Sequence, residues 1–324
     1  MTKDNPILEV AAAAALLTVA GGVFAAPVCL YVSSYHAGYH WNDGIEAGLE
    51  RSLGDACTLR RFYLDTQRNK APAFAEAKAL EAKRLIDEIK PAVVIACDDP
   101  ASKYLAVPYL KGTDLPLVFC GINWTLEPYG YPWPNATGMI EVAPIDPLIQ
   151  EARALVPEAR GLAFVSADVP TQHKEAERLE KAARAQGLEL QTRLAADFDQ
   201  WQTAFKEAQR ADLILLGNPA GIAGWDWQAA SRILLEETRR LTLSFGVAMS
   251  RHAVFAMVNV PEEQGEWAGE LAKLILAGQS PADLPVTANR RWQMYANPEL
   301  GRRIGIRLPE TILQHAVLGE AEGP

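Results

Sequence analysis

Residues 28–41 read VCLYVSSYHAGYHW, and this stretch decides the fold. Val28–Tyr35 is mostly apolar and predicts a buried strand, which runs into the polar and aromatic loop His36–Trp41. Asn42 and Asp43 then open a helix. A strand, a loop and a helix in this order form the unit from which parallel α/β sheets are built, so we expect an α/β protein that begins with its first sheet strand.

The residues before this strand have the features of a secretion signal. Lys3 supplies a positive start, Val10–Ala20 is apolar but too short to span a bilayer, and Val23-Phe24-Ala25 places small residues at a cleavage site. We therefore interpret residues 1–25 as a signal peptide and expect a periplasmic mature protein. Asp4 and Glu9 are atypical of a signal, and the alternative is a buried N-terminal helix.

Length and charge narrow the class of protein. The chain has 324 residues, which suits two lobes better than a single core. Its formal net charge is −9, and a nucleic-acid partner would require clustered Lys and Arg instead. We expect a small-molecule partner and no nucleic acid.

The four cysteines would meet an oxidising compartment if the chain is exported. Cys29 and Cys57 open two predicted strands, and Cys97 and Cys120 end two others. Neighbouring parallel strands could bring either pair within bridging distance. Buried free thiols are the alternative, and the spacing does not decide between them.

Strands and helices alternate in two successive runs. The first run predicts strands at 57–65, 92–97 and 115–120 and a helix at 71–90; the second predicts strands at 161–165, 188–194, 213–216 and 245–249 and helices at 171–186 and 225–242. Each run implies a doubly wound parallel sheet. Extended segments at 137–142, 254–260 and 286–295 read as crossings between the lobes. We expect lobe 1 to comprise 26–140 plus 254–283, and lobe 2 to comprise 141–253 plus 284–324.

Polar and aromatic side chains follow nearly every predicted strand. In open α/β sheets, ligands bind where the carboxyl ends of strands meet helix N-termini. Hydroxyls, amides, carboxylates, one arginine and several tryptophans together suit a small-molecule cleft. The candidate ligand-binding residues are Ser34, Tyr35, His36, Trp41, Asp98, Asp99, Ser102, Asn123, Trp124, Asp168, Asn218, Trp225, Ser250 and Arg251.

Several of these residues have a structural alternative. Asp99 could serve only as a helix cap, Trp41 could pack against the first helix, and Trp225 could pack on a lobe surface. Arg251 suits a ligand carboxylate, because its guanidinium can bind one bidentately. An inter-lobe salt bridge is the other interpretation of Arg251.

Motifs of catalysis and cofactor binding do not occur in the sequence. It contains no Gly-x-Ser-x-Gly, no glycine-rich phosphate loop and no His-Glu-x-x-His. We therefore expect no enzyme and no cofactor. His36, His40 and Asp43 could ligate a metal on one helical face, but they lie in a glycine-containing loop, so we expect no metal site.

Three segments resemble the ABC-transporter substrate-binding family, which includes components for tryptophan and tyrosine uptake. Residues 265–272 read GEWAGELA, followed by ILAGQSPADLPV at 275–286. Residues 297–306 (NPELGRRIGI) and 308–313 (LPETIL) are similar to the family's closing motif. Asn135-Ala136-Thr137-Gly138 is similar to its inter-lobe crossing.

The resemblance implies the type I periplasmic-binding-protein fold, with two α/β lobes joined by three crossings and a ligand in the cleft. It implies a monomeric solute-binding protein that delivers a small polar or aromatic molecule to an ABC permease. Residues 34–41 and 118–123 are more similar to a branch that also occurs as sensor domains. The alternative is therefore a sensory protein that presents its ligand to a membrane sensor kinase.

Overall fold

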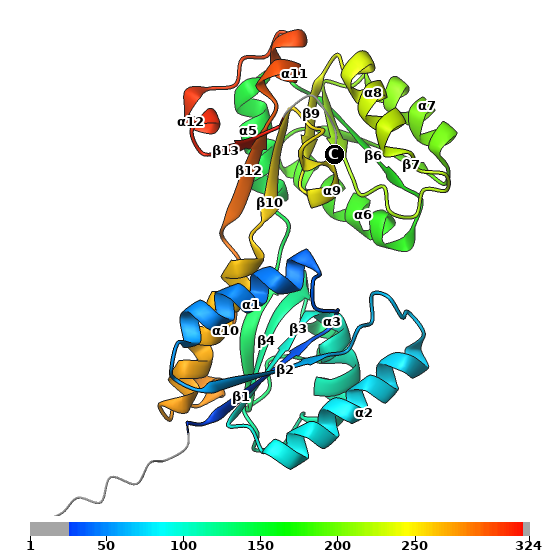
Figure 1. Ribbon diagram of the computed structural model, residues 1–324. Helices are drawn as coiled ribbons and strands as arrows, with labels where there is room; N and C mark the ends of the chain where they lie inside the picture. Colours follow the sequence, from blue (N-terminus) through cyan, green and yellow to red (C-terminus); the bar gives the residue numbers. More distant parts are fainter. Residues whose placement is uncertain (1–25, 320–324) are drawn as a thin grey trace, which may run out of the picture.

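Within residues 26–319, two sheets with helices on both faces make up two lobes, which Figure 1 shows one above the other. The computed structural model describes these residues, so the predicted signal peptide at 1–25 lies outside them. In the described range no helix combines the length and the apolar character needed to cross a membrane.

The sheet of the first lobe has the strand order β11-β5-β4-β3-β1-β2, and its strand pairs are parallel. A π-helical turn, Ser102–Ala106, joins α3 to α4. The elements of this lobe are β1 (Val28–Ser33), α1 (His40–Leu53), β2 (Thr58–Tyr63), α2 (Pro72–Ile89), β3 (Val93–Cys97), α3 (Asp98–Ala101), α4 (Val107–Tyr109), β4 (Leu117–Asn123), β5 (Ala136–Glu141), α10 (Pro261–Leu276) and β11 (Thr287–Ala288).

The sheet of the second lobe has the order β13-β12-β10-β9-β8-β6-β7, with β10 and β12 antiparallel and the other pairs parallel. Its elements are α5 (Ile145–Leu155), β6 (Gly161–Ala167), α6 (Pro170–Ala185), β7 (Glu189–Ala195), α7 (Phe198–Ala208), β8 (Leu213–Leu216), α8 (Trp227–Glu237), β9 (Leu241–Ser244), α9 (Val247–Ser250), β10 (Phe255–Asn259), β12 (Trp292–Ala296), α11 (Pro298–Arg303), α12 (Glu310–Leu313) and β13 (Ala316–Leu318).

Strand pairing moves two of the expected lobe boundaries. We expected 254–283 in the first lobe, but β10 pairs with β9 and β12 of the second sheet, so the crossing falls at Val260. We expected 284 to begin the second lobe, but β11 pairs with β5 of the first sheet, so that crossing falls at 289–291. Extended sequence alone does not show which sheet a strand joins.

The local prediction was wrong around residues 238–250. The helix expected at 225–242 ends at Glu237, and Leu241–Ser244 is a central strand between β8 and β10. The strand expected at 245–249 is instead the loop and short helix α9. Phe245 and Val247 in this segment line a cavity described below. Helix α7, which Asp197 caps at its N-terminus, was not predicted.

Apolar side chains fill the space between each sheet and the helices on its two faces. In the first lobe, Ile45 and Leu271 lie on one face and Ala82 and Leu105 on the other. In the second lobe, α5 and α6 cover one face and α7 and α8 the other. Each lobe therefore has its own core, as separate domains do.

Both cysteine pairs are joined in the structure. Cys29–Cys57 ties the start of β1 to the residue before β2, with a Cα–Cα distance of 5.9 Å. Cys97–Cys120 joins directly paired residues, the last residue of β3 and a residue in the middle of β4, with a Cα–Cα distance of 4.5 Å. The second bridge therefore fastens the end of β3 to β4 close to the carboxyl edge of the sheet, where ligands bind in this class of fold.

Helices α1 and α10 cross so closely that their backbones touch at glycines. A Cβ added at Gly265 would overlap the carbonyl oxygen of Ile45, and one at Gly48 would overlap the carbonyl oxygen of Glu262. These atoms belong to backbone, so no side-chain rotation relieves the clash. The two glycines thus fix the positions of the two helices on the first sheet. The N-termini of both helices lie at the edge of the cleft.

We predict that Gly265→Ala lowers the free energy of unfolding by about 1–3 kcal/mol, because the overpacking penalty exceeds the gain of about 1 kcal/mol in helix propensity. Urea unfolding measures the change. Gly246→Ala is the control, because its Cβ would meet nothing within 4 Å and its φ of −103° suits any residue. Equal stability of both variants would contradict the close crossing.

Candidate functional site

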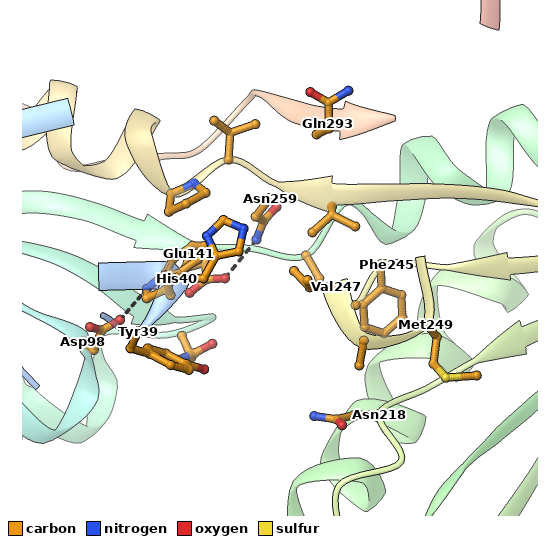
Figure 2. Close-up of a pocket in the computed structure, with 18 of the residues that line it drawn as sticks. Tyr39, His40, Asp98, Glu141, Asn218, Phe245, Val247, Met249, Asn259 and Gln293 are labelled. Atoms are coloured by element: carbon orange, nitrogen blue, oxygen red, sulfur yellow. Dashed lines mark hydrogen bonds between the residues drawn. The ribbon is translucent and has the colours of Figure 1, made fainter. Parts of the chain in front are cut away.

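A cavity of about 770 Å³ lies between the carboxyl ends of the two sheets, within the size range of small-molecule sites. Figure 2 shows residues of the two lobes facing each other across it. The first lobe and the crossings contribute Tyr35, Tyr39, His40, Trp41, Asp98, Asn123, Trp124, Glu141, Ala143, Val260, Pro261 and Glu262. The second lobe contributes Glu175, Gly217, Asn218, Phe245, Gly246, Val247, Ala248, Met249, Val258, Asn259, Gln293 and Tyr295.

Asp98 is placed in this wall by the way β3 ends. It has a left-handed φ of +71°, an uncommon conformation for a residue with a side chain, and only 1% of it is exposed. The Ser34 hydroxyl donates to the Cys97 carbonyl at 2.6 Å and accepts from the Ala101 N–H at 2.8 Å, which fixes the turn from strand to helix. Gly121 lies against Asp98 where a Cβ would meet Oδ1 at 2.5 Å.

The Asp98 carboxyl has little hydrogen bonding for a buried group. Trp41 Nε1 donates to Oδ1 at 2.8 Å, while Oδ2 has no partner within residues 26–319. Burial raises the pKa of Asp98 well above its ordinary value, and the nearby Glu141 raises it further. Asp98 is thus a carboxyl that keeps its proton more readily than usual.

Glu141 ends β5 in the same wall and is joined to the crossings. Asn259 Nδ2 donates to Glu141 Oε1 at 3.0 Å, and Asn289 Nδ2 donates to Asn259 Oδ1 at 2.9 Å. Asn289 also accepts from the Val142 N–H at 2.7 Å and donates to the Val142 carbonyl at 3.2 Å. One hydrogen-bonded chain therefore links all three crossings to a cavity carboxyl.

Removal from water raises the pKa of Glu141 to about 7. The hydrogen bond from Asn259 lowers this pKa, and the charge of Asp99 raises it further. Asp98 and Glu141 thus form a pair of cavity carboxyls that repel each other when both are ionised.

The second lobe offers an apolar and amide surface. Phe245 and Val247 follow β9, and Val247 is 55% exposed, unusual for a valine. Asn218 follows β8 and is exposed to the cavity. Glu175 on α6 is the exception, a carboxyl of which 8% is exposed and whose Oε1 has no partner within the described chain.

Trp124 reaches from the first lobe to the second. It follows β4 with a left-handed φ of +62° and packs beside the core of the second lobe. The Arg178 guanidinium lies over its ring at 4.5 Å and also pairs with Glu175 at 3.7 Å. Two of the strained residues at the cavity, Asp98 and Trp124, thus follow adjacent strands of the first sheet.

The structure brings six of the predicted residues together in the cavity wall and places eight outside it. Those in the wall are Tyr35, Trp41, Asp98, Asn123, Trp124 and Asn218. Those outside it are Ser34, His36, Asp99, Ser102, Asp168, Trp225, Ser250 and Arg251.

Four of the eight lie just behind the first-lobe wall and have other partners. Ser34 holds the turn before α3, as described above. The Asp99 carboxylate accepts from Asn123 Nδ2 at 2.7 Å and from the Tyr129 hydroxyl at 2.6 Å. Buried Ser102 accepts from the Tyr131 hydroxyl at 3.1 Å, and His36 lies beside Gln67, with Nε2 3.0 Å from Oε1.

The other four belong to the second lobe. Asp168 is exposed and lies 2.7 Å from His173 Nε2, and Trp225 packs edge-on against Trp201 with the ring centroids 4.8 Å apart. Ser250 is buried and donates to the Val247 carbonyl, and Arg251 is exposed, with its guanidinium 5.9 Å from the Tyr295 ring. The sequence predicts that Ser250 and Arg251 follow a strand, whereas they lie at the end of the short helix α9.

Sequence reasoning did not select several wall residues, among them Glu141, Glu175, Phe245, Asn259 and Tyr295. Glu141 and Asn259 end strands that were read only as crossings. Phe245 follows a strand that was predicted as helix. A correct assignment of β9 and β10 would have pointed to Phe245 and Asn259, because each directly follows or ends a strand.

His36, His40 and Asp43 are held apart by separate contacts. His36 lies beside Gln67, His40 begins α1, and Asp43 Oδ1 accepts from the Gly38 N–H at 2.9 Å. Among residues 26–319, no group of three or more His, Cys, Asp or Glu side chains is placed to hold a metal ion.

We predict that Glu141→Gln stabilises the ligand-free protein relative to the native chain above pH 7. The folded state holds a proton on Glu141 up to about pH 7, whereas the unfolded state releases it near 4.5. Native stability therefore falls with rising pH across this window, and the variant gains of the order of 1–3 kcal/mol between pH 4.5 and pH 8.

Urea unfolding of both proteins at a series of pH values measures this difference, with exposed Glu158→Gln as the control. A difference that does not change with pH would show that Glu141 has an ordinary pKa.

Comparison with known proteins places the chain in a family. The profile of the family described as ABC transporter substrate binding protein matches residues 36–318. No curated protein is similar enough in sequence to match.

Solved structures share the fold. A substrate-binding protein with adhesive properties from Clostridium difficile, CD0873, in its ligand-free, open form, has a TM-score of 0.72 at 14% identity, covering 91% of this chain and 100% of its own. An ABC domain from Streptococcus pneumonia, in complex with L-Trp, has a TM-score of 0.61 at 17% identity, covering 91% of this chain and 99% of its own.

An ABC sugar transporter's periplasmic binding protein from Legionella pneumophila has a TM-score of 0.52 at 14% identity, covering 81% of this chain and 98% of its own. The fold is that of type I periplasmic binding proteins. Because the profile match spans nearly all of the described residues, the chain belongs to the ABC transporter substrate-binding protein family.

Proposed function

We propose that this protein is a periplasmic solute-binding protein that captures a small polar or aromatic molecule in the cleft and delivers it to an ABC permease. The observation that carries the proposal is the cavity itself, which the carboxyl ends of both sheets line with amide, carboxyl and aromatic side chains. Family membership supports the transport role.

The crossings support a hinge. Each lobe has a separate core, and the chain between them consists of the short segments at 142–144, 260 and 289–291. The carboxamides of Asn259 and Asn289 hold these segments side by side. A ligand that contacts both walls would shift the population from open to closed lobes, and no chemical step is needed.

The neighbours suggest where to look for the ligand. The streptococcal domain was crystallised with L-Trp, and the cavity of this protein carries Tyr39, Trp41 and Phe245, whose rings can pack against a flat molecule. The closed form would be the one that a permease recognises, since closure changes the relative position of the two lobes.

We predict that a bound solute closes the lobes. A thermal-shift screen of amino acids, amines, nucleobases and sugars identifies the solute, because a ligand at 100 times its Kd adds about 2.7 kcal/mol of stability. Small-angle X-ray scattering of the saturated protein should then show a smaller radius of gyration than that of the free protein. A confirmed solute that leaves the radius of gyration unchanged would contradict closure of the lobes on the ligand.

Variants on both walls supply the control. Tyr39→Ala in the first lobe and Phe245→Ala in the second should each weaken binding by about 2- to 10-fold, the range for loss of one ring contact. Trp227→Ala removes an aromatic ring that is 37% exposed outside the cavity and should leave affinity unchanged. If only one of Tyr39→Ala and Phe245→Ala weakened binding, the solute would be held by one lobe rather than between the two lobes.

A further inference from the structure

The charged side chains of the cavity are of one sign. Among the described lining residues, Asp98, Glu141 and Glu262 belong to the first lobe and Glu175 to the second, whereas no Lys or Arg lines the cavity. His40 is the one basic side chain in the lining of the described chain. Figure 2 shows the carboxyls of Asp98 and Glu141 on the same side of the cavity.

Two of these carboxyls have an unused oxygen in a buried position. Asp98 Oδ2 and Glu175 Oε1 have no hydrogen-bond partner in residues 26–319, and the residues are 1% and 8% exposed. A buried oxygen without a donor is costly, and each such group calls for an explanation. The two groups lie on opposite lobes, so one ligand could supply a donor on each side.

Aromatic rings surround the carboxyls. Tyr35, Tyr39 and Trp41 line the cavity from the first lobe, and Phe245 and Tyr295 line it from the second. Ring faces attract ammonium groups, and most strongly where water is excluded. Carboxyls and ring faces together form a set that suits a positive charge on an organic molecule.

The nearby arginines already have partners. Arg178 lies over the Trp124 ring at 4.5 Å and pairs with Glu175 at 3.7 Å, and Arg251 lies over the Tyr295 ring at 5.9 Å. Neither lines the cavity. A ligand carboxylate would therefore face Asp98, Glu141 and Glu262 without a cation to neutralise it, at an electrostatic cost.

We propose that the ligand is an organic cation that carries no carboxylate: an amine or quaternary ammonium group on an aromatic or alkyl body, with its charge at Asp98 and Glu141. This inference rests on the proposed solute-binding function and specifies its ligand class. The proposal predicts that the site distinguishes a decarboxylated amine from the corresponding amino acid, although the two molecules have nearly the same shape.

The cation would also act on the hinge. Its charge favours the ionised forms of Asp98 and Glu141, so their protons are released as the ligand enters. Glu141 is bonded to Asn259, which connects the crossings, so the charge at the cavity wall is adjacent to the hinge. A donor directed to Glu175 from the same ligand would draw the second lobe toward the first.

Calorimetry with matched pairs tests the ligand class. The cationic probes are tryptamine, tyramine, choline and putrescine, and the carboxylate-bearing partners of the first two are L-tryptophan and L-tyrosine. We expect at least one cation to bind, and a bound aromatic amine to bind at least tenfold more tightly than its amino acid. Asp98→Asn, in which Asn tolerates the left-handed φ, and Glu141→Gln should each weaken the cation by about 10- to 100-fold.

Controls separate charge in the cavity from charge elsewhere. Glu177→Gln, on the exposed face of α6, removes the same charge as Glu175→Gln and should leave affinity unchanged.

Titrations in two buffers of different ionisation enthalpy should show proton release at pH 6.5, and affinity should fall as the pH is lowered below 7. The titratable groups around Glu141 are Asp98, Asp99, Tyr35, Tyr39, His40 and Glu262. The pH dependence of His40→Gln is therefore measured together with that of Glu141→Gln, so that the effect of the histidine charge can be separated from that of the carboxyls.

Three outcomes overturn the inference: none of the four cations binds, an amino acid binds more tightly than its amine, or the cation binds each of the two carboxyl variants as tightly as it binds the native protein. An amino acid or sugar that closes the lobes while all four cations fail would leave the solute-binding function standing. Binding of a cation without closure of the lobes would instead support the ligand class and contradict closure as the binding mechanism.

Discussion

Two lobes with separate cores must be joined by three neighbouring segments, and the carboxamides of Asn259 and Asn289 hold these segments together. Each amide both donates and accepts, so the chain from Glu141 through Asn259 and Asn289 to Val142 satisfies polar groups that have no sheet partner. These amide contacts lie at the crossings, and Trp124 with Arg178 adds a packing contact between the lobes. A hinge at the crossings would keep the lobes connected while the angle between them changes, which a protein that closes on a ligand requires.

The first-lobe wall is built so that a carboxyl stays buried without a charged partner. Cys97–Cys120 fastens the end of β3 to β4, Gly121 allows Asp98 to approach, and Ser34 fixes the turn that gives Asp98 its left-handed φ. The cost of that conformation and of the unpaired Oδ2 is borne by the surrounding packing. An arriving positive charge would relieve both the desolvation of Asp98 and its repulsion by Glu141.

The alternation of strands and helices, the two lobes and the family could be predicted from the sequence, because periodicity and strand-end chemistry are local. The assignment of strands to sheets could not. β10 looks like a crossing in sequence, and only its pairing with β9 and β12 shows that it belongs to the second sheet. Asp98, Asn123 and Asn218 were found because they follow strands, whereas Arg251 was misplaced because α9 was read as a strand. Glu175 comes from a helix, and no strand-end rule selects it.

The central claim is that the buried carboxyls of the cleft hold a cation between the lobes. A crystal structure of the protein saturated with tryptamine tests it most directly. The account predicts closed lobes, an amine nitrogen about 2.7–3.2 Å from a carboxyl oxygen of Asp98 or Glu141, and a ring in contact with residues of both lobes. An amine bound outside the cleft, or one that contacts only protein groups other than these carboxyls, would contradict it.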